Sequence, residues 1–235
     1  MLPSSRRRRQ GWRPSGGLLR FLARDDSRDV VKGLAVLVEV PRVHGNRGPR
    51  NTLTGISGDV LVARHRVGVL SEPTVVTNPV SNLKLASGIC DTKRIVDKGI
   101  NLAIGTDGVA SNNSLNYNEE IKLAGLLSKN LRGAENGITL RELLFASTRG
   151  GALSQGRDDA GIIKDGYRAD MILVDVRMSN MYPHNDLLSN IVYSMSPQNI
   201  KITIIDGNVV YKDGEFMHVD LERVRHEVDE FLGSL

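Results

Sequence analysis

One aspartate stands at a position that suits catalysis. Asp107 lies in the run Gly105-Thr106-Asp107-Gly108, directly after the mostly apolar segment 100–104. In parallel α/β folds the functional side chains follow the carboxyl ends of strands, so an aspartate there can bind a metal ion or accept a proton. An Asp-Gly pair is also typical of an ordinary turn, so this run alone leaves both interpretations open.

Polar side chains gather around two predicted strand ends, in residues 77–88 (TNPVSNLKLASG) and 109–116 (VASNNSLN). If the two strands are neighbours, six amides and hydroxyls surround the aspartate: Asn78, Ser81, Asn82, Ser111, Asn112 and Asn113. Such a set suits recognition of a polar ligand, although the same residue types also make turns and helix caps. We predict substrate contacts from Asp107, Asn78, Asn82, Ser111 and Asn112.

Strands and helices alternate around these residues. Residues 74–77 and 100–104 predict buried strands, while 92–100 and 116–130 have the spacing of amphipathic helices. A further helix is predicted over 139–156, opened by the capping-box pair Thr139 and Glu142. This alternation is typical of a parallel α/β sheet or barrel.

The pattern changes after Gly156. Residues 161–176 and 200–216 contain short alternating strands with Asp-Gly and Gly-Asn turns, which predict an antiparallel β unit. Residues 220–235 predict a closing amphipathic helix. The side chains expected to face inward are Leu221, Val224, Val228 and either Phe231 or Leu232.

Composition limits the class of protein. Apolar residues make up 40% and charged residues 25% of the 235, as in soluble globular proteins, and no apolar run is long enough to span a membrane. The single cysteine, Cys90, excludes an intrachain disulfide and a cysteine-rich zinc site, and it favours a reducing compartment. We expect Cys90 to be a small, partly buried side chain. No signal peptide with an apolar core is visible, so the cytoplasm is the expected location.

Residues 1–72 form a divergent basic segment. They hold 14 Lys and Arg against 6 Asp and Glu, a net charge of +8, whereas the remaining residues carry −4. Arg6 to Arg9 are consecutive, and phosphate binding, targeting and a solvated tail are competing interpretations of this run. No nucleic-acid motif or aromatic interleaving accompanies it, so we do not predict a nucleic-acid partner. Part of the segment is expected to be disordered, and residues 30–40 could form a strand or a short helix.

Two ordered motifs carry a family resemblance. NPVSNLKLASG (78–88), followed by GTDGVASNNSLN (105–116), resembles the seventh and eighth strand ends of the cytosine deaminase/chlorohydrolase branch of the amidohydrolase superfamily. Within that branch the chain is most similar to the 5-methylthioadenosine/S-adenosylhomocysteine deaminases. Residues 160–176 resemble the segment where the chain of these enzymes leaves the barrel and enters a small β domain, and residues 205–216 resemble the last hairpin of that domain. The likeness therefore runs from about Val75 to the end.

The resemblance implies an α/β fold. Residues 73–155 are expected to form the C-terminal half of a (β/α)8 metal-dependent hydrolase barrel. Residues 156–235 are expected to form a small β-sandwich-like subdomain with the C-terminal helix. Family members hold one zinc or iron ion with three histidines and an aspartate, and that aspartate matches Asp107.

The resemblance also implies hydrolytic deamination of an adenine nucleoside, a small purine substrate. A metal-bound hydroxide attacks the amino-bearing carbon, and Asp107 both binds the metal and takes a proton from the water. Guanine or cytosine deamination, dechlorination, and a non-catalytic chain that acts through protein association remain alternatives. Assembly into a homo-oligomer stays open.

The histidines depart from the family pattern. The chain has five: His44, His65, His184, His218 and His226. None forms a His-x-His motif, and no His-x-x-Glu precedes the matched region. His65 resembles the histidine after the sixth strand and is our second catalytic candidate, whereas the other four suit surface positions. We therefore expect a truncated deaminase that lacks most metal ligands and holds the ion weakly or not at all.

Overall fold

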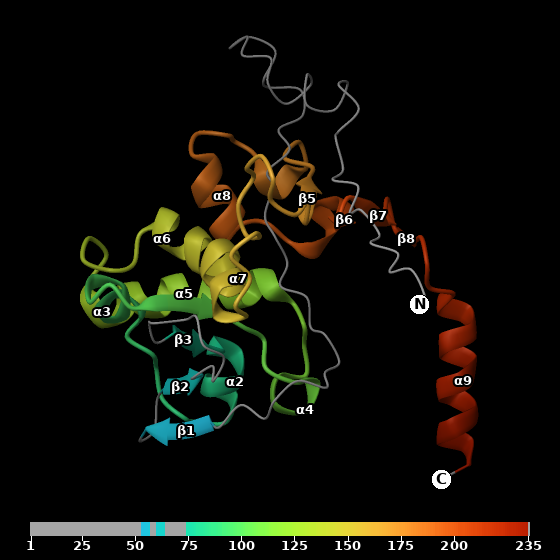
Figure 1. Cartoon of the computed structure of the whole chain (residues 1–235), viewed down its shortest axis with the longest axis horizontal. Helices are drawn as coiled ribbons and strands as arrows, with labels where there is room; N and C mark the ends of the chain where they lie inside the picture. The colour runs from blue at the N-terminus through green and yellow to red at the C-terminus, as the bar shows by residue number, and fades with distance from the viewer. Residues whose placement is uncertain (1–52, 57–59, 64–73, 235) are drawn as a thin grey trace, which may run out of the picture.

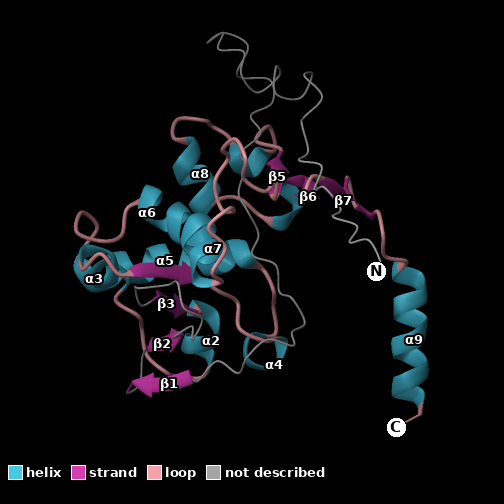
Figure 2. Cartoon of the chain, in the orientation of Figure 1, coloured by secondary structure: helices cyan, strands magenta, loops and turns pink. Residues whose placement is uncertain are grey.

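The computed structural model describes residues 53–56, 60–63 and 74–234, with side chains from residue 74 onward (Figure 1). The described strands form two four-stranded sheets, one from the first half of this region and one from the second. Figure 2 shows the first sheet at lower left and the second at upper right, with the helices around them.

The first sheet has the order β1-β2-β3-β4, and only its last pair is parallel. Its strands are β1 (Leu53–Ile56), β2 (Val60–Ala63), β3 (Thr74–Thr77) and β4 (Asn101–Ile104). Val75 lies opposite Leu102 in the parallel pair, as the alternation of strand and helix predicts. β1 pairs with β2, and β2 with β3, in antiparallel fashion. Two parallel neighbouring strands need a crossover connection of about a dozen residues or more. Residues 64–73, which separate β2 from β3 in the sequence, are too few for one.

Helices follow each parallel strand and cover the first sheet. They are α2 (Pro79–Lys84), α3 (Thr92–Asp97), α4 (Val109–Asn112), α5 (Tyr117–Arg132), α6 (Leu140–Phe145), η2 (Ala146–Gly150) and α7 (Gly151–Ser154). The predicted capping box is present, because Thr139 and Glu142 exchange both hydrogen bonds at the start of α6. The helix predicted over 139–156 is interrupted by the π-helical η2, which packs against β4.

A glycine permits that close packing. A Cβ atom on Gly150 would lie 2.1 Å from the backbone oxygen of Leu102 in β4. The side chain of Asn101 in β4 also donates to the backbone oxygen of Gly150 at 3.1 Å. The helix therefore contacts the strand backbone without a side chain between them.

The first core joins β3 and β4 to the helices. Its buried members are Val75, Leu102, Ile104, Ile121, Ala124, Ile138, Leu143, Ala146 and Val192. Burying apolar surface of this kind is the main favourable term in folding. The buried side of α5 supplies Ile121 and Ala124, as its helical spacing predicts.

The second sheet is antiparallel, with the order β5-β6-β7-β8, as predicted. Its strands are β5 (Met171–Val174), β6 (Ile200–Ile205), β7 (Asn208–Lys212) and β8 (Glu215–Phe216). Three short helices connect β5 to β6: η3 (Ser179–Met181), α8 (Leu187–Tyr193) and η4 (Pro197–Asn199). Asp206-Gly207 and Asp213-Gly214 turn the chain between strands, and all four residues have positive φ. Two such residues in sequence are typical of a tight hairpin turn.

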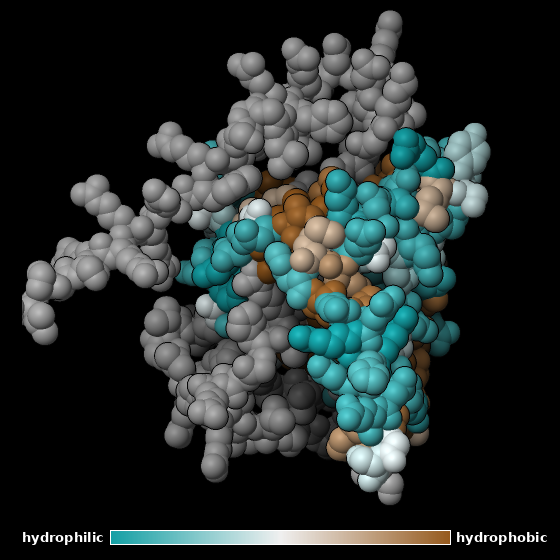
Figure 3. Space-filling view, turned by 90° about the vertical axis from the view of Figure 1, so that its right-hand side faces the viewer, coloured by the Kyte–Doolittle hydropathy of each residue, from teal (hydrophilic) through white to brown (hydrophobic). Residues whose placement is uncertain are grey.

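The last helix, α9 (Leu221–Gly233), does not pack as predicted. Its apolar side chains are 40–63% exposed: Leu221, Val224, Val228, Phe231 and Leu232. The expectation that they face inward is wrong, because no described element packs against them and α9 projects away from the rest (Figure 1). The space-filling view from that side shows apolar surface among polar residues (Figure 3). None of the described helices has the length and apolar character needed to cross a bilayer.

Candidate active site

Asp107 follows β4 after two residues, and its backbone has an unusual conformation. Its φ is +59°, in the left-handed region that residues other than glycine rarely adopt. Such a conformation costs about 1 kcal/mol or more and persists only where the surroundings hold it. The side chain is exposed. The loop therefore presents a carboxylate to the open end of the parallel strand pair.

Two hydrogen bonds hold this carboxylate. The Ser81 hydroxyl donates to Oδ2 at 2.7 Å, and the Gly108 amide donates to Oδ1 at 2.7 Å. Ser111 makes a third, smaller contribution that lowers the pKa of this carboxyl. Together Ser81, Gly108 and Ser111 hold the pKa of the Asp107 carboxyl below its usual value, so it is ionised at neutral pH. An ionised carboxylate can accept a proton or ligate a cation.

Ser81 and Asp107 meet because β3 and β4 are parallel neighbours. Ser81 lies in α2, which begins directly after β3, and it is buried. The backbone pairing continues beyond the strands, since the Gly105 amide donates to the Thr77 oxygen at 2.9 Å. Asn78 lies against the same turn, where a Cβ atom on Gly105 would come within 2.6 Å of its Oδ1. The two strand ends thus form one polar rim.

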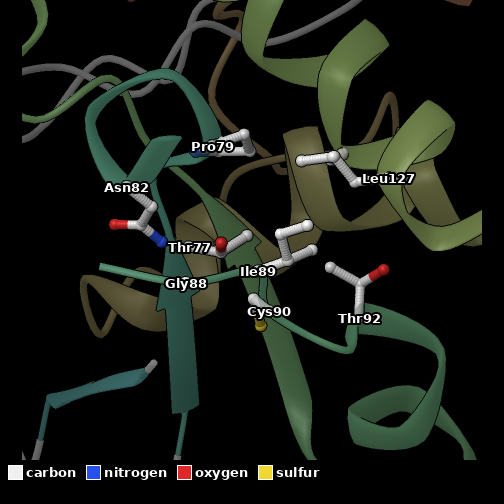
Figure 4. Close-up of a pocket in the computed structure, with 9 residues that line it drawn as sticks. Thr77, Pro79, Asn82, Gly88, Ile89, Cys90, Thr92 and Leu127 are labelled. Carbon is white, nitrogen blue, oxygen red and sulfur yellow. The ribbon is translucent and has the colours of Figure 1, made fainter. Parts of the chain in front are cut away.

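Asn82 lies elsewhere on α2. It lines a small cavity between α2, α5 and the segment before α3, together with Thr77, Pro79, Gly88, Ile89, Cys90, Thr92, Ala124 and Leu127 (Figure 4). Asp107 and Ser111 do not line this cavity. Cys90 is buried there, whereas the sequence predicted a partly buried side chain.

Asn112 faces the interior of its loop. It is buried, and its Nδ2 atom donates to the Thr106 backbone oxygen at 2.6 Å and to Glu120 Oε1 at 2.5 Å. Its neighbour Asn113 adopts a left-handed conformation and accepts a hydrogen bond from Lys84. Both amides therefore hold the loop that carries Asp107.

Glu120 belongs to this site, although the sequence analysis did not select it. It lies in the first turn of α5 and is fully buried. Burial raises the pKa of the Glu120 carboxyl, while hydrogen bonds from Val80 and Asn112 oppose that rise. One signal was available: Glu120 is four residues before Ala124, on the apolar side of the predicted helix.

The histidines do not gather at Asp107 in the described part of the chain. His65, the second catalytic candidate, lies outside the described residues. His184 is near the second sheet, where its Nε2 atom is 2.5 Å from the Val176 backbone oxygen. His218 and His226 are exposed, one before α9 and one within it.

Comparison with known proteins decides the family. The profile of the Amidohydrolase family matches residues 52–210, well over half of the chain. The chain belongs to the amidohydrolase family. The resemblance read from its two motifs is thereby confirmed.

Relatives of this amidohydrolase are named as deaminases. It is 39% identical over 173 residues to a 5-methylthioadenosine/S-adenosylhomocysteine deaminase of Dictyoglomus thermophilum, a match that covers 73% of this chain and 41% of the relative. It is also 39% identical over 170 residues to a 5'-deoxyadenosine deaminase of Methanosarcina acetivorans, covering 72% of this chain and 38% of the relative. The chain thus spans about two fifths of the length of these relatives.

Solved structures support the barrel-type fold. An adenosine deaminase from Xanthomonas campestris with bound zinc superposes with a TM-score of 0.66 at 32% identity, covering 68% of this chain and 37% of that one. A zinc-bound atrazine chlorohydrolase from Arthrobacter aurescens gives a TM-score of 0.62 at 24% identity, covering 66% and 35%. The second likeness shows the fold alone.

The described residues of this amidohydrolase do not complete a zinc site. Within residues 74–234 no group of three or more His, Cys, Asp or Glu side chains could hold a metal ion. Tight catalytic zinc sites use three protein ligands, and this region supplies one carboxylate with the right surroundings, that of Asp107. A complete site needs ligands from elsewhere.

Proposed function

We propose that this chain supplies the C-terminal portion of a metal-dependent hydrolytic deaminase of adenine nucleosides. The observation that carries the proposal is the ionised Asp107 carboxylate after β4, held by Ser81 from the end of β3. Family membership and the deaminase relatives support the reaction class.

The reaction replaces the amino group of the adenine ring by oxygen from water and releases ammonia. Asp107 is suited to accept a proton from the attacking water, because its carboxylate is ionised, exposed and fixed by two hydrogen bonds. We propose that it also supplies one ligand to a zinc or iron ion. The remaining ligands of that ion come from outside residues 74–234.

The substrate class follows from what the relatives share. 5-Methylthioadenosine, S-adenosylhomocysteine and 5'-deoxyadenosine all carry an adenine nucleoside, and they differ at the ribose 5' position. The hydroxyl of Ser111 and the amide of Asn78 lie on the same rim as Asp107 and are our candidates for contacts with the polar substrate.

Complementation tests this function. The full chain is mixed with the N-terminal three fifths of the Dictyoglomus thermophilum relative, zinc and 5-methylthioadenosine, and ammonia release is followed. We expect release from the mixture and a loss of at least about 100-fold with Asp107→Asn, which keeps the size of the side chain and removes its charge. Asp97→Asn, a change at an exposed aspartate on α3, is the matched control.

The outcomes separate the alternatives. Equal ammonia release by the native chain and Asp107→Asn would exclude Asp107 from the chemistry. No release from any mixture, with both parts folded, would favour a non-catalytic chain. Release from guanosine or cytosine in place of the adenine nucleoside would keep the deaminase and change its substrate.

A further inference from the structure

The buried Glu120 connects the two short helices beside Asp107, α2 and α4. Its Oε2 atom accepts from the Val80 backbone amide at 3.0 Å, in the segment after β3. Its Oε1 atom accepts from Asn112 Nδ2 at 2.5 Å, at the end of α4. One carboxylate in the first turn of α5 therefore bridges segments that are 32 residues apart in sequence, Val80 and Asn112.

Each of these contacts is one residue away from a serine that acts on the Asp107 carboxyl. Val80 precedes Ser81, whose hydroxyl donates to Asp107 Oδ2. Asn112 follows Ser111, which contributes to the lowered pKa of the same carboxyl. The same Asn112 amide donates to the backbone oxygen of Thr106, the residue before Asp107. Glu120 thus lies behind the site, at the junction of all the segments around it.

The chemistry of these contacts requires a carboxylate. Both partners of Glu120 are N–H donors, and the two oxygens of its carboxyl group accept from them. An amide would present its own NH2 group to one of the two donors. Burying a charged side chain is costly unless it is fully hydrogen-bonded, so an apolar residue would serve the core of α5 at lower cost.

We propose that Glu120 is a positioning residue for the Asp107 carboxylate. By fixing the distance between α2 and α4, it keeps Ser81 in contact with Asp107, keeps Ser111 beside that carboxyl, and holds the left-handed backbone at Asp107. The benefit of this positioning for catalysis rests on the proposed function, whereas the positioning of Asp107 by Glu120 does not.

The test compares the full chain with its Glu120→Gln and Glu119→Gln variants. Glutamine keeps the size of the side chain but loses one of the two hydrogen bonds. Glu119, the exposed neighbour on the same helix, provides the matched control. The readout is the hydrogen-exchange rate of the Gly108 amide, which donates to Asp107 Oδ1 and not to Glu120.

We expect Glu120→Gln to accelerate exchange at Gly108 about fivefold or more, the effect of losing roughly one hydrogen bond, and Glu119→Gln to leave it unchanged. A folded Glu120→Gln variant with native exchange at Gly108 would overturn the proposal and leave Glu120 a purely structural role. Retained far-ultraviolet circular dichroism shows that the variant is folded.

A second variant covers the case in which Glu120→Gln does not fold. Asn112→Ala removes the link between Glu120 and α4, together with the Asn112 hydrogen bond to the Thr106 backbone oxygen, and leaves the Val80 contact intact. It should accelerate exchange at Gly108 in the same direction by about twofold, and no acceleration would also overturn the proposal. Because exchange needs neither metal nor substrate, failure of the deamination assay and failure of the positioning role are seen separately.

Discussion

Helices α5 and α9 have the same kind of sequence pattern and different surroundings. Both place apolar side chains on one face at helical spacing. The apolar face of α5 is buried against β4 and α6, with Ile121 and Ala124 nearly inaccessible. All apolar side chains of α9 are at least 40% exposed. Periodicity therefore predicts which face of a helix is apolar, and it does not show that a partner for that face is present.

The largest expected difference in the free energy of unfolding between the first core and α9 comes from truncating a leucine side chain to alanine. Leu143→Ala in the first core should lower the free energy of unfolding by about 2–5 kcal/mol, because Leu143 is completely buried. Leu232→Ala on α9, where the side chain is 59% exposed, should change it by less than about 0.5 kcal/mol. Urea unfolding followed by circular dichroism measures both. A loss of 2 kcal/mol or more with Leu232→Ala would mean that α9 is packed after all.

Two glycines, Gly150 and Gly233, allow a second comparison of stability between the first core and α9. Gly150→Ala should lower the free energy of unfolding by about 1–3 kcal/mol, since its methyl group would collide with the Leu102 backbone oxygen. Gly233→Ala on α9 meets no atom within 4 Å and should have an effect within about 0.5 kcal/mol. Thermal unfolding of the two variants beside the native chain gives the result. Equal stabilities would contradict the close contact between η2 and β4.

Removing one helix cap in each region should give the smallest difference in the free energy of unfolding. Thr139→Ala removes the capping box of α6 and should lower the free energy of unfolding by about 1 kcal/mol. Asp220→Ala removes the side chain that accepts from the Arg223 amide at the start of α9. Because α9 has no described packing partner, this change should reduce helical circular dichroism and leave the urea midpoint unchanged. A shift of that midpoint would show that α9 unfolds together with the core.

Much of the fold could be predicted from local sequence. The strands before Asn78 and Gly105, the helix of α5 and the capping box at Thr139 depend on nearby residues, and the structure contains all of them. The π-helical turn and the exposed face of α9 could not be predicted in this way. The first is associated with a contact between Gly150 and a strand 48 residues earlier in the chain, and the second depends on which elements surround the helix.

The site was predictable to a similar extent. A carboxylate after β4 with hydroxyls from the neighbouring loop follows from two motifs and the parallel order of their strands, which brings Ser81 to Asp107. The roles of Asn112 and Glu120 were not predictable from the motifs. Asn112 turns inward because a buried carboxylate accepts from it, and the burial of Glu120 in turn requires donors from two other segments.

The assignment of Asp107 as a metal ligand can be decided by locating the metal. Crystals of the complemented deaminase, grown with zinc, would be measured at the zinc absorption edge. We expect an anomalous peak about 2.0–2.2 Å from an Asp107 carboxylate oxygen, the distance of a zinc–carboxylate bond. A zinc ion bound elsewhere, in an active complex whose Asp107 carboxylate keeps only its hydrogen bonds from Ser81 and Gly108, would contradict the assignment.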